Sequence, residues 1–281
     1  MRPKLVIERA RAKVNLALHI VGRRLDGYHE LDSIVAFADV ADSLTITVAD
    51  QLALTVSGPF DGMVPTDRTN SVLKAWQSLF DHQMQRGKRL PPLAFHLEKN
   101  LPVSSGIGGG SADAAAALRG IIQFCDLVIA QDELSALALK LGADVPVCLA
   151  QQRCRMRGIG DVLEKHDHVF PPAIVLVNPL RPASTAKIFD ILGLQRGEAV
   201  NGNAAADFWR NDLTQAAIKA VPQITTVIQA LEVQPTLSHV RMSGSGATCF
   251  GLAENLESAA SATDVIKKKY PDWWVVATTL A

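Results

Sequence analysis

Apolar and polar residues alternate along residues 13–21, KVNLALHIV. The apolar side chains at positions 14, 16, 18 and 20 share one face, and Lys13 and Asn15 lie on the other. A period of two is typical of a half-buried β-strand. We therefore predict a strand here, with Lys13 and Asn15 on its polar face.

The pattern stays β-rich after this strand. Residues 22–48 contain an Asp26-Gly27 turn signal and then two further β-rich runs, which predicts an antiparallel sheet in the first third of the chain. A helical pattern follows at 71–84. After a loop at 86–92, residues 93–102 are expected to form a strand.

Residues 102–113, PVSSGIGGGSAD, interrupt the pattern and lead directly into an alanine-rich run. The spacing then predicts helices over 111–124 and 132–141, the second ending at Gly142. We expect a domain boundary near residue 153, which divides the chain into an N-terminal domain, 1–153, and a C-terminal domain, 154–281.

The second half mixes strands and helices. Strand-like runs around 168–179 precede a helical pattern over 208–231 that Pro222 breaks. β-like segments near 239–253 and 273–280 flank a predicted helix at 256–269. Without a regular strand–helix repeat, the pattern favours the α+β class.

Composition narrows the choice of function. The 281 residues include 28 Lys and Arg and 28 Asp and Glu, so the chain lacks the basic excess of a nucleic-acid-binding protein. The four cysteines form no C-x-x-C pair, which argues against a disulfide scaffold or zinc site and favours a reducing cytoplasm. The most apolar window, 112–130, contains three charged residues, so neither a signal peptide nor a membrane span is expected. We therefore expect a small-molecule partner and no nucleic acid or membrane.

The glycine-rich stretch has the character of an anion-binding loop. Glycines let backbone N–H groups converge on a ligand, and a helix starting at Ser111 adds the positive end of its dipole. A Walker loop needs Gly-Lys-Ser/Thr, but Ala112 follows Ser111 here. The chain lacks the third glycine of a dinucleotide-binding fingerprint, and the helical segment that follows leaves no room for the second strand of that motif. A plain turn remains an alternative.

The segment PVSSGIGGGSADAAAAL resembles the phosphate-binding motif of the GHMP kinases, with Ile107 where leucine is usual. AKVNLALHIVGRRLDGYHELDSI and VRMSGSGATCFGL resemble two further family segments, in the expected order along the chain. The resemblance implies a two-domain α+β GHMP kinase fold, with an N-terminal ribosomal-protein-S5-like domain and a C-terminal ferredoxin-like domain. It also implies ATP with Mg²⁺ as cofactor.

The same resemblance assigns the reaction. It implies that Asp144 of LGADVPV is the base that accepts the substrate hydroxyl proton, and that Lys13 pairs with it and faces the transferred phosphate. A nearby cation lowers the pKa of a carboxyl group and keeps it ready to accept a proton. Alternatively, Asp144 caps a following helical turn and Lys13 is an ordinary solvated lysine. The ATP-binding residues implied are Pro102, Val103, Ser104, Ser105, Gly106, Ile107, Gly108, Gly109, Gly110, Ser111 and Ala112, with no residue assigned to the metal.

Within the family, KVNL, DGYHEL, LGADVPVCL and RNDL resemble the members whose substrate carries a cytidine diphosphate group. That resemblance implies that Tyr28 and His29 hold the cytosine, Tyr28 by stacking. It also assigns Phe189 as a second stacking ring, although a core phenylalanine is the alternative. Further substrate-binding candidates are Asn15, Thr185, Ser243 and Gly244, and the last two alternatively form only a tight hairpin.

Two rival functions remain open at this point. One is another small-molecule kinase of the same fold, acting on mevalonate, homoserine or a sugar. The other is a protein of this fold that binds its ligand without catalysing transfer, which the presence of both Lys13 and Asp144 disfavours. We expect a monomer or weak homodimer.

Overall fold

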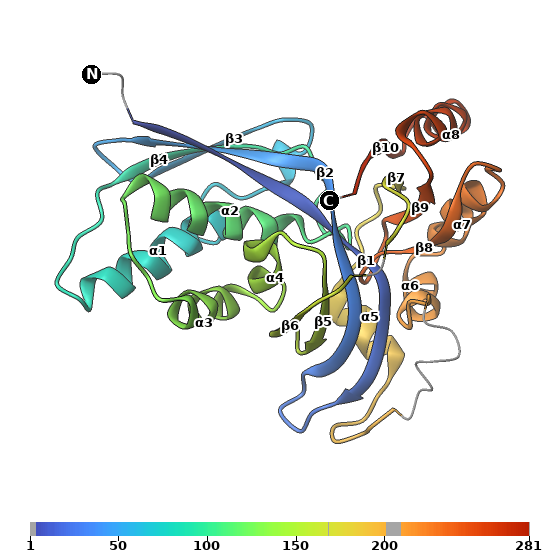
Figure 1. Cartoon of the computed structure of the whole chain (residues 1–281), viewed down its shortest axis with the longest axis horizontal. Coiled ribbons are helices and arrows are strands. Elements are labelled where there is room, and N and C mark those ends of the chain that lie inside the picture. Colours follow the sequence, from blue (N-terminus) through green and yellow to red (C-terminus); the bar gives the residue numbers. More distant parts are fainter. Residues whose placement is uncertain (1–3, 168, 201–208, 281) are drawn as a thin grey trace. The chain divides into compact units, whose positions relative to one another are not determined.

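The computed structural model describes residues 4–167, 169–200 and 209–280. The chain packs as two compact units that are interleaved in sequence (Figure 1). The first contains the described residues up to Arg11, then Ala41–Val103 and Gly109–Ala150. The second contains Ala12–Val40, Ser104–Gly108 and the described residues from Gln151 onward. The expected division at residue 153 stays a prediction.

Two long paired strands, β1 (Leu5–Arg23) and β2 (His29–Val48), contribute residues to both units. The strand predicted over 13–21 lies within β1 and is confirmed. The two β-rich runs predicted before residue 48 both form strand, but they are joined into one strand, β2, of 20 residues. Asp42 interrupts its apolar pattern, yet the buried carboxylate accepts the backbone N–H groups of Asn100 and Leu101, so the strand continues.

The first unit places helices on one face of a sheet (Figure 1). Within the sheet, β2 pairs antiparallel with β4 (Leu93–Glu98), and β3 (Ala53–Ser57) pairs parallel with β4. The helices are α1 (Ser71–Met84), α2 (Gly109–Phe124), α3 (Gln131–Leu141), α4 (Val145–Ala150) and the 3₁₀ turn η1 (Asp61–Met63).

The alanine-rich helix α2 forms the centre of this unit. It contacts both α1 and α4, and its residues 114–118 are buried. Small side chains let neighbouring helices approach closely without losing helix propensity. The predicted helix over 71–84 is confirmed, whereas α2 begins at Gly109, two residues before the expected start at Ser111. Both Gly109 and Gly110 therefore lie in its first turn.

The second unit contains an antiparallel sheet in the order β10-β7-β9-β8, whose strands are β7 (Ala173–Asn178), β8 (Ser238–Met242), β9 (Cys249–Ala253) and β10 (Trp274–Thr279). Helices α7 (Gln223–Glu232) and α8 (Leu256–Lys269) pack on it. Apart from two further helices between β7 and α7, the order β7-α7-β8-β9-α8-β10 with this strand order is the ferredoxin-like arrangement that was expected. The helix predicted over 256–269 is confirmed.

The break that Pro222 was predicted to make in the helical pattern is confirmed. The stretch forms two helices, α6 (Thr214–Ala220) and α7, separated around Pro222. Phe208, at its expected start, lies outside the described residues, as does His168 before β7. Strands β5 (Cys154–Gly158) and β6 (Val162–Lys165) were not predicted, because they are short and rich in charged residues. β5 pairs antiparallel with β2 and with β6.

The core of the second unit recruits residues from β1. Leu18 and Ile20 are buried in one cluster with Val175, Ile224 and Ile266, from β7, α7 and α8. The α+β class is confirmed. No helix in the described part of the chain is both long and apolar enough to cross a bilayer.

Candidate functional site

The glycine-rich loop leads into the first turn of α2. Its backbone has positive φ at Ser104, Gly106 and Gly108, with values of 53°, 78° and 66°. A Cβ placed on Gly110 would meet no atom within 4 Å, so the space beside the first helical turn is open. The first N–H groups of a helix have no partner inside it and are available to an anion. This geometry supports the predicted phosphate-binding role.

Ser243 and Gly244 pack against the glycine-rich loop within the second unit. The hydroxyl of Ser243 donates to the carbonyl oxygen of Gly106 at 3.0 Å and accepts the N–H of Asn15 at 3.1 Å. A Cβ on Gly106 would lie 2.6 Å from the carbonyl oxygen of Ser243, and one on Gly244 would lie 2.6 Å from that of Gly106. Both glycines have positive φ, so larger residues are strained at either position. The loop between β8 and β9 is therefore more than a hairpin, although its part in substrate binding stays a prediction.

Lys13 lies beside the same loop. Its N–H donates to the carbonyl oxygen of Ile107 at 2.9 Å, and a Cβ on Gly108 would lie 3.3 Å from the Cβ of Lys13. Lys13 is only 4% exposed, so the alternative of a solvated surface lysine is wrong. Its assigned position next to phosphate is compatible with this placement.

Asp144 immediately precedes α4 in the first unit, and its carbonyl oxygen accepts the N–H of Cys148 at 3.2 Å. This is the position of a helix-capping residue, so the capping alternative stays open beside the catalytic one. Lys13 belongs to the second unit. Its pairing with Asp144 therefore stays a prediction.

Asn15 has a buried polar atom to offer a ligand. Its side-chain NH₂ donates to the Ser33 hydroxyl at 2.8 Å, which in turn donates to the carbonyl oxygen of Ala17 at 2.6 Å. The Oδ1 atom of Asn15 has no partner among the described residues, although Asn15 is 1% exposed. Buried polar atoms rarely stay unpaired. A donor group on the substrate would complete this amide.

Tyr28 and His29 adjoin the predicted Asp26-Gly27 turn, which forms. The Asp26 carboxylate accepts the N–H of Tyr28 at 3.1 Å, and the Tyr28 ring is exposed. The His29 ring stacks on Phe189 with centroids 4.3 Å apart and 27° between the planes. Burial, assisted by Arg23 and opposed by Asp190, lowers the pKa of His29, which favours the neutral ring at pH 7.

Phe189 packs in the second unit and also contacts one of the predicted site residues. It lies on α5 (Thr185–Leu192), packs against the core of the second unit and stacks on His29. Both earlier interpretations of Phe189 therefore have geometric support. Thr185 begins the same helix, with its hydroxyl 2.8 Å from that of Ser245.

For the implied magnesium ion, the described residues contain no group of three or more His, Cys, Asp and Glu side chains arranged to hold a metal. Magnesium retains water and binds phosphate oxygens readily, so one or two protein ligands suffice. Ser111, half-buried in the first turn of α2, stays a predicted contact to phosphate or metal.

Sequence reasoning missed the role of Asn211 in RNDL. Its side-chain NH₂ donates to the carbonyl oxygens of Met242 and Gly244, at 2.9 and 2.8 Å. The adjacent Asp212 accepts the N–H of Ile20 at 2.9 Å. The RNDL segment, residues 210–213, therefore links β1 to the loop between β8 and β9, which packs on Gly106. The motif was visible in the sequence, but its partners lie far away in the chain.

A buried ion cluster beneath the start of α2 was also missed. The Lys99 ammonium donates to Asp42 at 2.5 Å and to Asp113 at 2.7 Å. All three side chains are at most 3% exposed. In the sequence, Asp113 was only one of the three charged residues of the apolar window 112–130.

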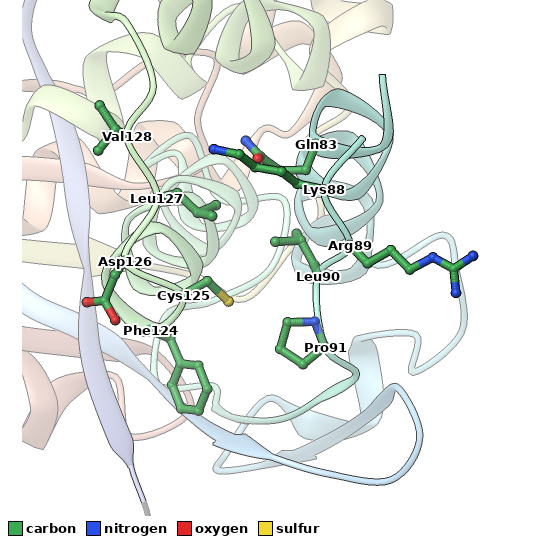
Figure 2. Close-up of a pocket in the computed structure, with 10 residues that line it drawn as sticks. All are labelled: Gln83, Lys88, Arg89, Leu90, Pro91, Phe124, Cys125, Asp126, Leu127 and Val128. Atoms are coloured by element: carbon green, nitrogen blue, oxygen red, sulfur yellow. The ribbon is translucent and has the colours of Figure 1, made fainter. Parts of the chain in front are cut away.

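The first unit also contains a pocket of about 620 Å³ at the opposite end of α2 (Figure 2). Leu90, Cys125 and Leu127 surround it, and Arg89 points away from it. At about 1.5 Å per residue, the 16 residues of α2 place its two ends roughly 24 Å apart. None of the predicted site residues lines this pocket, so it is separate from the glycine-rich loop.

Two protein-family models match the chain. The GHMP kinases N terminal domain matches residues 70–152, and the GHMP kinases C terminal domain matches residues 196–272. A protein of Rhizobium etli named 4-diphosphocytidyl-2-C-methyl-D-erythritol kinase is 43% identical, over 97% of this chain and 94% of its own. A Bradyrhizobium protein of the same name is 42% identical, over 98% and 96%.

Solved structures show the same fold. The crystal structure of a 4-(cytidine 5'-diphospho)-2C-methyl-D-erythritol kinase has a TM-score of 0.77 and 29% identity, covering 98% of this chain and 99% of its own. Homoserine kinase from Cytophaga hutchinsonii has a TM-score of 0.74 with 18% identity, covering 100% and 96%. At that identity the second likeness concerns the fold alone.

Proposed function

Because the chain belongs to the GHMP kinase family, we propose that it transfers the γ-phosphoryl group of ATP to the 2-hydroxyl of 4-diphosphocytidyl-2-C-methyl-D-erythritol. This is a step of the non-mevalonate, or methylerythritol phosphate, isoprenoid pathway. The observation that carries the proposal is 43% identity, over 97% of the chain, to a protein bearing that kinase name. The site residues support it as follows.

Phosphoryl transfer requires positioning and the stabilisation of spreading negative charge more than covalent participation by the protein. Asp144 takes the proton from the 2-hydroxyl, the oxygen attacks the γ-phosphorus, and the bond from that phosphorus to the β,γ-bridging oxygen breaks to leave ADP. Lys13 neutralises charge on the transferred group. The open space beside Gly110 and the N–H groups of the first α2 turn support phosphate binding there. Bound magnesium would neutralise phosphate charge.

The cytidyl group is assigned to the second unit. The exposed Tyr28 ring offers a stacking face. His29 has a buried ring nitrogen, Nε2, without a partner among the described residues. Together they suit a ligand with a flat base and a polar edge. Asn15 supplies an acceptor for a substrate donor.

We further propose a cytoplasmic location and a monomer or weak homodimer. All four cysteines, at 125, 148, 154 and 249, are free, which supports a reducing compartment.

The decisive experiment measures ADP release with Mg-ATP and one acceptor at a time: the cytidyl compound, mevalonate, homoserine and galactose. We expect turnover with the cytidyl compound alone. Turnover with another acceptor would retain the kinase but reject the substrate assignment. Absence of turnover with every acceptor would favour a ligand-binding protein.

Asp144→Asn separates catalysis from binding. If Asp144 is the base, turnover should fall about 10²–10⁴-fold with ligand affinity largely unchanged. Asp132→Asn, on the exposed side of α3, is the matched control. Turnover of Asp144→Asn close to that of the control would identify Asp144 as a helix cap.

A further inference from the structure

The ion cluster of Lys99, Asp42 and Asp113 connects three elements of the first unit. Asp42 lies on β2, Lys99 directly follows β4, and Asp113 lies in the second turn of α2. Lys99 has a fixed backbone: its N–H donates to the carbonyl oxygen of Ser57 at 2.7 Å, and a Cβ on Gly58 would lie 2.6 Å from the Lys99 carbonyl oxygen. The backbone of Lys99 is therefore held in place, and its ammonium group joins it to Asp113 on the helix.

The cluster also contacts the first residue of that helix. A Cβ on Gly109 would lie 3.2 Å from Nζ of Lys99 and 3.9 Å from Oδ2 of Asp42. The buried ammonium donates a hydrogen bond to each carboxyl group. Such charge-assisted contacts are directional and resist displacement, since separation would leave the buried cation without its partners. Burial acts to lower the pKa of Lys99, but the two carboxylates outweigh it and leave the pKa raised, so the cation persists.

We propose that Lys99 is a positioning residue for the nucleotide. It holds the first turn of α2 in the geometry that presents its N–H groups to phosphate. This inference rests on the function proposed above, because it assumes that a nucleotide phosphate binds at this helix start. Lys99 acts through the helix, and its loss displaces the N–H groups that form the cradle.

The test compares two variants of the full chain with wild type. Lys99→Met removes the cation, and Asp113→Ala releases only the helix while Lys99 keeps Asp42. Misplaced binding groups cost large factors, so we expect affinity for Mg-ATP and for a non-hydrolysable ATP analogue to fall about 10- to 100-fold. Calorimetry measures the affinity, and the KM for the acceptor should change much less than the KM for ATP.

Arg119→Met is the matched control for general destabilisation. Arg119 lies on the same helix and binds Glu8 and the carbonyl oxygens of Cys148 and Arg9, far from the first turn. This variant should lower the melting temperature while nucleotide affinity stays close to wild type. Equal nucleotide affinity in wild type, Lys99→Met and Asp113→Ala would overturn the inference alone. Failure of the wild-type chain to bind nucleotide would overturn the proposed function together with it.

Discussion

Oδ1 of Asn15 and Nε2 of His29 are buried polar atoms that lack partners among the described residues. Leaving such atoms unpaired costs free energy, and native proteins contain few of them. In the same unit, Tyr28 exposes 58% of its surface. The unpaired atoms and the exposed ring support the predicted nucleobase site, which stays a prediction.

Replacing Tyr28 with alanine should therefore affect one substrate only. Base stacking on an aromatic ring contributes about 1–3 kcal/mol, so the KM for the cytidyl compound should rise about 5- to 150-fold. The KM for ATP should stay near its wild-type value. Steady-state kinetics with each substrate varied in turn measure both, and Tyr28→Phe, which keeps the ring, is the control. An equal loss for both substrates would indicate a folding defect.

Asp113 makes stability depend on pH. Burial, opposed by Lys99 and reinforced by Asp42, raises the pKa of Asp113 to about 7 from an ordinary 3.8. The folded chain then binds this proton more tightly than the unfolded chain does. The resulting stabilisation is fully present below about pH 4 and is lost as the pH rises to about 7.

Asp113→Asn stays neutral throughout and should remove this dependence. Between about pH 5 and pH 8, the free energy of urea unfolding should fall more for wild type than for the variant. Other titrating groups are common to both proteins and cancel in the comparison. Parallel pH profiles would show that the Asp113 carboxyl titrates in its ordinary range.

Sequence motifs located Lys13 and Asp144 but not their surroundings. The alternation over 13–21 correctly placed Lys13 on a strand, yet it also allowed a solvated lysine, and only the packing of Gly108 and Ile107 shows that it is buried. Lys99 and Asp42 had no local signal. They are 57 residues apart, so their pairing depends on the sheet and not on spacing.

Helices with strong local signals were predicted best. α1 has a capping Asn70, whose Oδ1 accepts the N–H of Val72, and α8 is capped by Asn255 in the same way through Ser258. Both match their predicted ranges. The start of α2 was predicted two residues too late, because glycines at a helix start resemble loop residues. Gly109 is helical here and lies close to the Lys99 ammonium.

Two glycines of the phosphate loop should respond differently to alanine. Gly106→Ala places a methyl group against Ser243 and strains a positive φ, so it should destabilise the fold by about 1–3 kcal/mol. Gly110→Ala enters open space in a helix and should leave stability unchanged or slightly increased. If phosphate occupies that space, Gly110→Ala should nevertheless weaken ATP binding.

Chemical unfolding and nucleotide titration of the two variants provide the measurements. Unchanged ATP affinity in Gly110→Ala would support the alternative that the loop is only a turn between strand and helix. A Gly106→Ala variant as stable as wild type would contradict the close packing of the two loops.

Each compact unit is assembled from separate stretches of the chain. The core of the second unit contains Leu18 and Ile20, and β5 pairs with residues 31–35 of β2. A fragment of residues 154–281 therefore lacks part of its own core and one strand partner. We expect it to be unfolded or aggregated by circular dichroism and gel filtration, whereas the full chain folds cooperatively. A fragment with native-like cooperative unfolding would contradict this.

The interleaving also constrains folding during synthesis. Residues 12–40 leave the ribosome early, yet their unit is complete only when β10 arrives at Trp274–Thr279. At about 5–20 residues per second, the ribosome needs roughly 12–50 s to make the intervening chain. During that interval the apolar β-hairpin of residues 12–40 is exposed, because the sheet and helices that cover it have not yet been made. We therefore expect the nascent chain, more than the finished enzyme, to depend on chaperones that shield exposed strands.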